Sequence, residues 1–404
     1  MLTVLSLFDD RSKPKGSRDP LGIEAIWSFL GRKVVGNLTT ITNNLDNFIV
    51  ALLCCYHGNS RSTDLNAIQQ DFMRAEQLAD YLRLALNENA SFLGITRAKA
   101  NHKNSFYPLG LSEEAQILSN QLSYGLWGLY STAMQVAKLI QGSERKLTST
   151  GQDLIQRLLI RLGDDNWNDF VKVASKENAS AEDIKRLAKP FNDLLADDEI
   201  KQAMVNSLLG WQSVSALQRE LFAKAQDYLS SKYTEQINAQ QFCAWVVEQH
   251  GISDDLKCTL QQIQSIEPLL VLAATLMDWL QGQRNKSRND LVSELQPALT
   301  GIAFKEEWTQ VLKLPHKSPF LANLHQCANS ADAAGVINVL LEQNKTVMKQ
   351  RGGASWLEWE GERLKVRVPN DKPILRERLV EFCQTWRNNY FIGSFLYITK
   401  AGLK

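Results

Sequence analysis

The segment that organises the chain begins Ser17-Arg18-Asp19-Pro20-Leu21-Gly22-Ile23-Glu24 and continues to Asn44. A proline disfavours the helical conformation in the residue before it, so we expect Asp19 in an extended or turn conformation. Asp19 then suits the cap of a helix that has Pro20 in its first position. Apolar residues at helical spacing follow, and they predict a short amphipathic helix that ends at Gly31: Ile23, Ile26, Trp27 and Leu30.

The residues after this first helix differ from it in composition. Val34 to Ile41 are rich in β-branched side chains and too polar for a buried helix, which predicts a short strand or an extended loop. Either Asn43 or Asn44 can cap the helix that follows, whose apolar residues run from Leu45 onward.

Two interpretations of the opening segment stay open. In the first it is a binding loop, because guanidinium, ammonium and amide groups can meet phosphate or the carboxylates of a partner. The side chains that would bind are Arg18, Arg32, Lys33, Asn37, Thr39 and Thr40. In the second, the segment is a surface turn and a connection between helices.

Helical patterns dominate the chain beyond this segment. Ser112 to Gln141 has the pattern of one long helix, interrupted by Gly125 and Gly128. Each glycine is unfavourable inside a helix by about 1 kcal/mol relative to alanine, so the pair predicts a kink or the close approach of another backbone. This helix and the next one, with a short polar link before Leu147-Thr148, together look similar to the end of a winged-helix module.

The sequence therefore predicts a mainly α, multi-helix protein with a small α+β cap at its C-terminal end. We expect three consecutive regions: a helical domain with a winged-helix-like part over residues 1–165, a helical middle domain over 166–345, and the cap over 346–404. At 404 residues, two or three domains are the usual number.

The cap contains the clearest strand pattern. Trp356-Leu357-Glu358-Trp359 and Leu364-Lys365-Val366-Arg367-Val368 alternate with period two, and Gly361-Glu362 between them suits a two-residue turn. The predicted register pairs Glu360 with Arg363 and Glu358 with Lys365. It also pairs Trp356 with Arg367.

Composition excludes several classes of protein. The net charge of +1 gives no global reason to expect a polyanionic partner. The six cysteines form no motif and fit buried thiols in a reducing, cytoplasmic setting. Met1 to Phe8 lacks a basic lead, so we expect no signal peptide, and the longest apolar runs are too short to span a bilayer.

Motifs for catalysis are not evident in the sequence. The five histidines share no metal-ligand spacing, and no phosphate-binding, dinucleotide-binding or nucleophile-elbow motif occurs. We therefore expect no cofactor, no metal, no small-molecule substrate and no catalytic residue. Glu358, Glu360 and Lys365 resemble the carboxylates and lysine of nucleases, but cross-strand charge pairing explains them better.

Positive charge gathers at the C-terminal end. Residues 345–404 hold twelve Lys/Arg and six Asp/Glu, a local net charge of +6. With aromatic neighbours such as Trp386 and Tyr390, this region is a candidate contact for nucleic acid through phosphates and base stacking. The candidate binding residues are Arg351, Lys365, Arg367 and Arg387.

Two pieces of the chain resemble uncharacterised bacterial proteins of anti-phage defence islands. The first is Ser17-Arg18-Asp19-Pro20-Leu21-Gly22 with Thr39-Thr40. The second is Arg351-Gly352-Gly353-Ala354-Ser355-Trp356 with Trp386-Arg387-Asn388-Asn389-Tyr390-Phe391. Such proteins are commonly encoded beside helicases or nucleases, so the resemblance implies a subunit of an antiviral defence complex.

Three functions remain open from the sequence. The first is a non-catalytic subunit or adaptor of a multiprotein assembly, which binds other protein subunits and no membrane. The second is a DNA-binding adaptor that uses the basic cap. The third is a nuclease-like enzyme whose site is assembled from distant residues.

Overall fold

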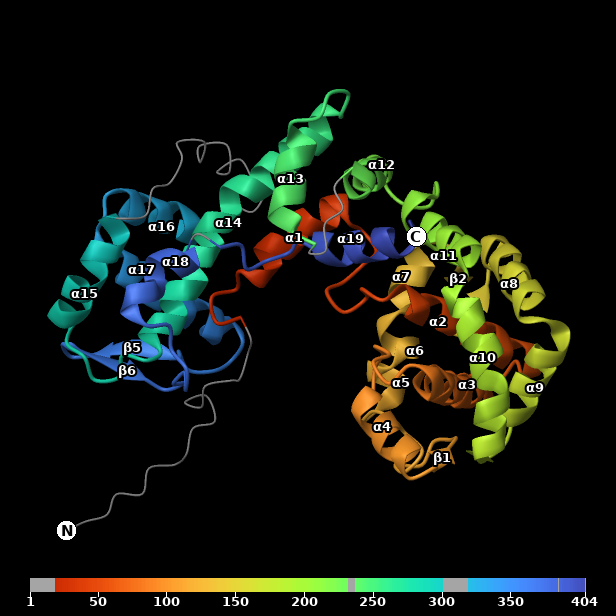
Figure 1. Cartoon of the computed structure of the whole chain (residues 1–404). Helices are drawn as coiled ribbons and strands as arrows, with labels where there is room; N and C mark the ends of the chain where they lie inside the picture. The colour runs from red at the N-terminus through yellow and green to blue at the C-terminus, as the bar shows by residue number, and fades with distance from the viewer. Residues whose placement is uncertain (1–18, 232–236, 301–318, 384, 404) are drawn as a thin grey trace, which may run out of the picture. The chain divides into compact units, whose positions relative to one another are not determined.

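The computed structural model describes residues 19–231, 237–300, 319–383 and 385–403 (Figure 1). Helices make up most of these residues, and the strands are two to four residues long in three separate two-stranded sheets. The prediction of a mainly α protein is confirmed.

The chain divides into two compact units, each assembled from separate segments. Unit 1 comprises Met1–Gly31 and Val247–Tyr390, and unit 2 comprises Arg32–Val246 and Phe391–Lys404. Each unit groups residues that lie in contact in space, although they come from separate parts of the chain. The bounds of the units therefore differ from the three consecutive ranges expected from the sequence. Because both ends of the chain contribute to this division, linear sequence alone does not reveal it.

Unit 2 is built around α3 (Leu65–Leu86), which contacts α2, α4, α5, α6, α9 and α10. Its apolar positions are buried, and so are the polar side chains of Glu76, Gln77, Asp80 and Arg83. The other helices of unit 2 are α2 (Leu45–Arg61), α4 (Ile95–Lys103), α5 (Gln121–Tyr124), α6 (Leu126–Leu129), α7 (Ser131–Val136), α8 (Ser149–Leu162), α9 (Asp164–Ala174), α10 (Ala181–Ala196), α11 (Asp198–Val205), the π-helix η2 (Asn206–Gly210), α12 (Ala216–Ser231), α13 (Ala239–Val247) and α19 (Ile392–Ala401).

Two short ribbons complete unit 2. β1 (Tyr107–Pro108) pairs with β4 (Asn178–Ala179), and β2 (Ile140–Gln141) pairs with β3 (Lys146–Leu147). The second ribbon directly precedes α8, at the link where the sequence resembles the end of a winged-helix module. The winged-helix interpretation stays a prediction.

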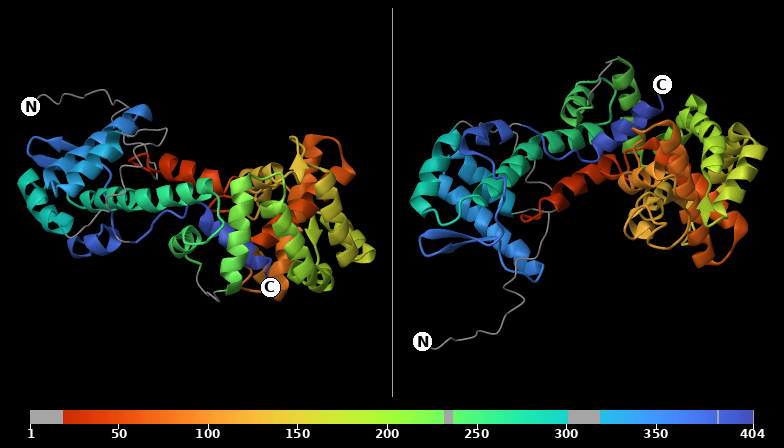
Figure 2. Two further views of the ribbon diagram at one scale, coloured as in Figure 1. Left: turned by 90° about the horizontal axis from the view of Figure 1, so that it is seen from above. Right: turned by 60° about the horizontal axis from the view of Figure 1, so that its bottom comes forward.

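Unit 1 is built on α14 (Asp254–Leu280), the longest helix in the described residues (Figure 2). It is also the one described helix that is long and apolar enough to cross a membrane, and 72% of the window concerned is buried inside the protein. The core helix of a soluble protein has the same properties. The remaining elements of unit 1 are α15 (Arg288–Thr300), α16 (Pro319–Asn329), α17 (Ala333–Gln350), β5 (Leu357–Glu360), β6 (Arg363–Val366), the 3-10 helix η4 (Arg376–Arg378) and α18 (Leu379–Cys383).

The β5–β6 hairpin has the predicted register. Glu358 lies opposite Lys365 and Glu360 lies opposite Arg363, while the backbone of Arg367 donates to the carbonyl oxygen of Trp356. Gly361 has a φ of 60°, the left-handed conformation that a tight hairpin turn requires. Residues 285–288 extend the sheet, because their backbone exchanges hydrogen bonds with Leu364 and Glu362.

The opening segment differs in part from its prediction. Asp19 does accept backbone hydrogen bonds, from Ile23 at 2.9 Å and Glu24 at 3.0 Å, but α1 (Glu24–Val34) begins after the turn that contains Pro20. The helix passes through Gly31, so the expected end there is wrong. An extended loop follows, and Asn44 caps α2 as predicted by accepting from the backbone of Asp46.

The single long helix expected over residues 112–141 is wrong. Three short helices, α5, α6 and α7, occupy residues 121–136 of this range. Gly125 separates α5 from α6 in an extended conformation, and the carboxylate of Glu76 on α3 accepts the freed backbone N–H of Leu126 at 2.7 Å. The predicted kink is therefore present, and a buried side chain from a distant helix stabilises it.

Candidate functional site

The four basic residues predicted to bind nucleic acid in the C-terminal region each form an ion pair with a carboxylate. Lys365 lies 2.7 Å from Glu360, and Arg367 binds Glu358. Arg387 lies 3.0 Å from Asp278, and Arg351 lies 3.8 Å from Asp19. Phosphate would have to displace these carboxylates, which weakens the interpretation of this surface as a nucleic-acid contact.

The residues of the opening segment that were predicted to form a binding loop do not lie together in the structure. Arg18 lies outside the described residues, and Lys33 lies in the last turn of α1. Arg32 donates to the carbonyl oxygen of Leu38 at 2.5 Å, and its guanidinium carbon is 4.0 Å from the centroid of the Phe391 ring. A guanidinium held in this way positions the loop after α1.

Asn37 is 2% exposed and has an internal role. Its Nδ2 donates to the carbonyl oxygen of Leu208 in η2 at 2.8 Å, and its Oδ1 accepts from Gln218 of α12 at 2.9 Å. Gln218 also accepts the backbone N–H of Gly36 at 2.8 Å. These bonds fasten the loop inside unit 2, so the Asn37 side chain is not available to a partner in the way the binding-loop interpretation expected.

The turn of residues 19–21 is held against α17. Nδ2 of Asn344 donates to the carbonyl oxygen of Pro20 at 3.0 Å, and Gln343 donates to that of Leu21 at 2.8 Å. Arg351, just after α17, donates to the carbonyl oxygen of Asp19 at 2.6 Å. Asn344 is fully buried and also accepts the backbone N–H of Trp356 at 2.7 Å. One amide therefore connects the N-terminal turn to the start of the hairpin.

Residues 387–390 are held by the carboxylate of Glu267 in the middle of α14. Its oxygens accept four hydrogen bonds: from the backbone N–H groups of Arg387 and Asn388, each at 2.8 Å, from Nδ2 of Asn388 at 3.0 Å, and from the hydroxyl of Tyr390 at 2.6 Å. Burial raises the pKa of Glu267 above its ordinary value, and these donors act in the opposite direction. The Tyr390 ring in turn packs edge-on against Trp27 of α1, with 6.2 Å between centroids.

A surface cavity of about 270 Å³ lies where these held segments meet. The turn before α1, the start of α1, α14 and the 387–388 loop supply its walls. Its lining residues are Asp19, Pro20, Leu21, Ile23, Glu24, Trp27, Ala274, Met277, Asp278, Arg387 and Asn388. We refer to it as the unit 1 cavity.

The unit 1 cavity combines negative charge with an aromatic wall. Asp19, Glu24 and Asp278 contribute carboxylates, whereas Arg387 is the one cation among the described lining residues and is paired with Asp278. An indole beside carboxylates suits a cationic side chain, which gains from both the ring face and the opposite charge. Among the described residues, no group of three or more His, Cys, Asp or Glu is placed to hold a metal ion.

Sequence reasoning found part of this cavity and missed its supports. It singled out the Asp19 turn, Arg351 and Arg387, and the structure brings these three together within unit 1. It missed Asn344 and Glu267. An acidic residue inside the apolar run Ile266-Glu267-Pro268-Leu269-Leu270 was a usable signal, because a buried carboxylate needs donors.

No family model, curated protein or solved structure matches the chain.

Proposed function

We propose that the protein is a non-catalytic subunit of a multiprotein assembly, and that it binds a partner protein through the unit 1 cavity. The observation that carries this proposal is the convergence of three segments distant in sequence on one preformed cavity. Buried groups whose bonds are all internal, Asn344 and Glu267, hold these segments in place. A surface built with such support is suited to binding without rearrangement.

The lining indicates the chemistry of the partner. A protruding arginine or lysine would meet the carboxylate of Glu24 while its aliphatic part lies along Trp27 and Met277. This is the reverse of the sequence-based expectation, in which Arg18, Arg32 and Lys33 met the acidic groups of a partner. In the proposed contact this protein contributes the negative charge.

The resemblance to defence-island proteins supports an anti-phage assembly in the bacterial cytoplasm. Both pieces that carry the resemblance contribute to the unit 1 cavity. The first supplies Asp19, Pro20 and Leu21, and the second supplies Arg387 and Asn388, with Arg351 holding the turn. The DNA-binding and nuclease-like alternatives have no comparable support, since the nominated cations are paired with carboxylates.

Charge reversal at the cavity tests the proposal. The tagged protein is purified from its own host as wild type, as Glu24→Arg and as Glu377→Arg, and the co-purifying subunits are identified and their stoichiometry measured. Glu377 is exposed in unit 1 and does not line the cavity, so it is the matched control. We expect Glu24→Arg to reduce a stoichiometric partner at least tenfold with Tm nearly unchanged, and Glu377→Arg to retain it.

Reconstitution then assigns the contact. An Arg→Glu change in the partner should restore binding to Glu24→Arg and weaken binding to wild type, because the opposite charges are exchanged. A complex that assembles equally well with both variants contradicts the proposal, and so does loss of the partner in the Glu377→Arg control.

A further inference from the structure

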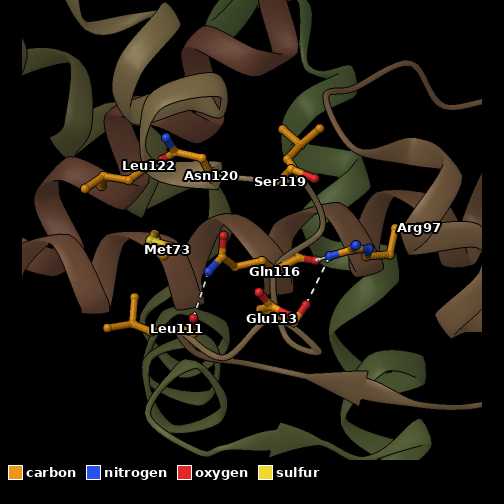
Figure 3. A pocket seen from close by; sticks show the side chains of 9 residues that line it. Met73, Arg97, Leu111, Glu113, Gln116, Ser119, Asn120 and Leu122 are labelled. Atoms are coloured by element: carbon orange, nitrogen blue, oxygen red, sulfur yellow. Dashed lines mark hydrogen bonds between the residues drawn. The ribbon is translucent and has the colours of Figure 1, made fainter.

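Unit 2 contains a second, larger cavity that the proposed function does not use. Its volume is about 480 Å³, within the range of roughly 300–1,000 Å³ that is typical of small-molecule sites. It lies between α3, α4 and the 111–122 segment (Figure 3). Its lining residues are Met73, Arg97, Leu111, Glu113, Gln116, Leu118, Ser119, Asn120 and Leu122.

The 111–122 segment is fixed by internal bonds, so this cavity is preformed. Nη1 of Arg97 donates to the carbonyl oxygens of Glu113 at 3.0 Å and Gln116 at 2.6 Å. The Gln116 side chain donates to the carbonyl oxygen of Leu111 at 2.8 Å and accepts the backbone N–H of Gln121 at 3.2 Å. Arg97 and Gln116 thus give the segment its shape while they form part of the wall.

The lining changes from charged to apolar across the cavity. Figure 3 shows Met73, Leu111 and Leu122 on one side and Arg97 on the other, with the Glu113 carboxylate in the middle below Gln116. Ser119, Asn120 and Gln116 lie between these two sides. A ligand that complements this arrangement carries both charges at one end and an apolar body at the other.

Several polar groups of the wall remain available for a ligand. In the part of the chain that the structure describes, the Glu113 carboxylate, the Ser119 hydroxyl and the Asn120 amide form no hydrogen bond with another residue. Asn120 precedes α5 in a left-handed conformation with a φ of 53° and does not cap that helix with its side chain. These groups supply acceptors and donors beside the charged end.

We propose that this cavity is a binding site for a free apolar α-amino acid. The ammonium group lies at the Glu113 carboxylate, the carboxylate lies at the remaining N–H groups of Arg97, and the side chain lies over Met73, Leu111 and Leu122. The proposal does not depend on the unit 1 cavity or on the partner that binds there. It adds a small-molecule ligand to a chain in which sequence analysis expected none.

Calorimetry on the full-length protein tests the site directly. Leucine, methionine and phenylalanine are titrated individually, with aspartate and lysine as polar comparisons. N-acetyl-leucine lacks the ammonium charge and leucine amide lacks the carboxylate. We expect the three apolar amino acids to bind, and each modified leucine to bind at least tenfold more weakly because one of its two charges is lost.

Matched variants locate the binding. Glu113→Gln should weaken leucine binding at least tenfold, whereas the neighbouring Glu114→Gln, which does not line the cavity, should leave it unchanged. The proposal is overturned if none of the three amino acids produces heat or raises Tm at millimolar concentration. It is also overturned if N-acetyl-leucine amide binds as tightly as leucine, or if the two glutamate variants behave alike.

Discussion

The hydroxyl of Tyr390 donates a 2.6 Å hydrogen bond to Oε2 of Glu267, and both residues are completely buried. This bond connects the middle of α14 to the segment that carries Arg387 and Asn388, two residues of the unit 1 cavity. Tyr390 and Phe391 have φ values of 51° and 62°, a conformation that bulky residues seldom adopt. The carboxylate of Glu267 therefore stabilises an unfavourable backbone conformation at the edge of the cavity.

Tyr390→Phe should destabilise the protein by about 1–3 kcal/mol, because the buried carboxylate of Glu267 loses one of its four donors. Urea denaturation measures the change, with Tyr397→Phe as the control, since Tyr397 is 52% exposed. In a double-mutant cycle, Tyr390→Phe and Glu267→Gln should show a coupling of about 0.5–3 kcal/mol. Strictly additive effects of the two substitutions would show that the bond contributes nothing.

The hairpin was predictable because its determinants are local. Alternation with period two and a glycine at the turn fix both the strands and the register of Glu358 with Lys365. The contacts that create the unit 1 cavity are not local. The bond between Asn344 and Pro20 spans 324 positions, and that between Arg351 and Asp19 spans 332. Sequence patterns indicated that these residues were unusual, but not that they meet.

The failed prediction over residues 112–141 has a specific cause. The apolar residues of this range have helical spacing. The break depends on Glu76, which lies on another helix 50 residues earlier and whose carboxylate accepts the backbone N–H of Leu126. A local pattern of apolar residues does not reveal that contact. A buried acceptor at that position makes a break at Gly125 favourable, because the freed N–H is satisfied. The two glycines predict the break correctly, whereas helical periodicity alone predicts one continuous helix.

Gly125→Ala should lower stability by about 1–3 kcal/mol through overpacking. A Cβ at this position would lie 2.5 Å from the carbonyl oxygen of Gln121 and 2.7 Å from Oε1 of Glu76. Gly36→Ala is the control, because its Cβ would find its nearest atom at 3.6 Å. Thermal melting compares the two variants. Equal melting temperatures would show that the backbone at Gly125 yields without strain.

His57 should make folding sensitive to acid. It is completely buried among Trp167 and Phe170, and neither ring nitrogen has a hydrogen-bond partner among the described residues. Burial lowers its pKa to about 4 from an ordinary 6.5. The unfolded chain therefore binds the proton more readily than the folded chain below pH 6.5. Neutral His57 contributes its full stabilisation of the fold above pH 6.5, and this contribution is lost as the pH falls toward 4. The loss amounts to about 3 kcal/mol of the free energy of unfolding.

Denaturation at pH 7.5 and pH 5 measures the effect of His57. His57→Phe should lose less stability than wild type between these two values, whereas His250→Ala, at an exposed histidine, should follow wild type. The comparison between variants is necessary because Glu76 has the opposite effect. Burial raises its pKa to about 7, so Glu76 destabilises the fold as the pH rises from 4.5. Parallel pH profiles for wild type and His57→Phe would contradict the assignment.

Removing the acidic partners of the hairpin cations should increase binding to DNA. Lys365 and Arg367 are held by Glu358 and Glu360, so their charges are largely neutralised at the surface. Replacing both acids by glutamine frees two cations for phosphate contacts. We expect Glu358→Gln with Glu360→Gln to bind a duplex DNA probe more tightly than wild type, with an affinity that falls as salt rises.

Fluorescence anisotropy measures the DNA affinity of this double variant and of Lys365→Ala at low and at physiological salt. Glu377→Gln is the control, because it removes one negative charge at an exposed position outside the hairpin. Lys365→Ala should leave any DNA binding of the wild-type protein unchanged, because the pairing has already neutralised that lysine. If Lys365→Ala instead abolishes binding that wild type shows at physiological salt, the hairpin is a nucleic-acid contact. The DNA-binding adaptor would then take precedence over the protein adaptor proposed for the unit 1 cavity.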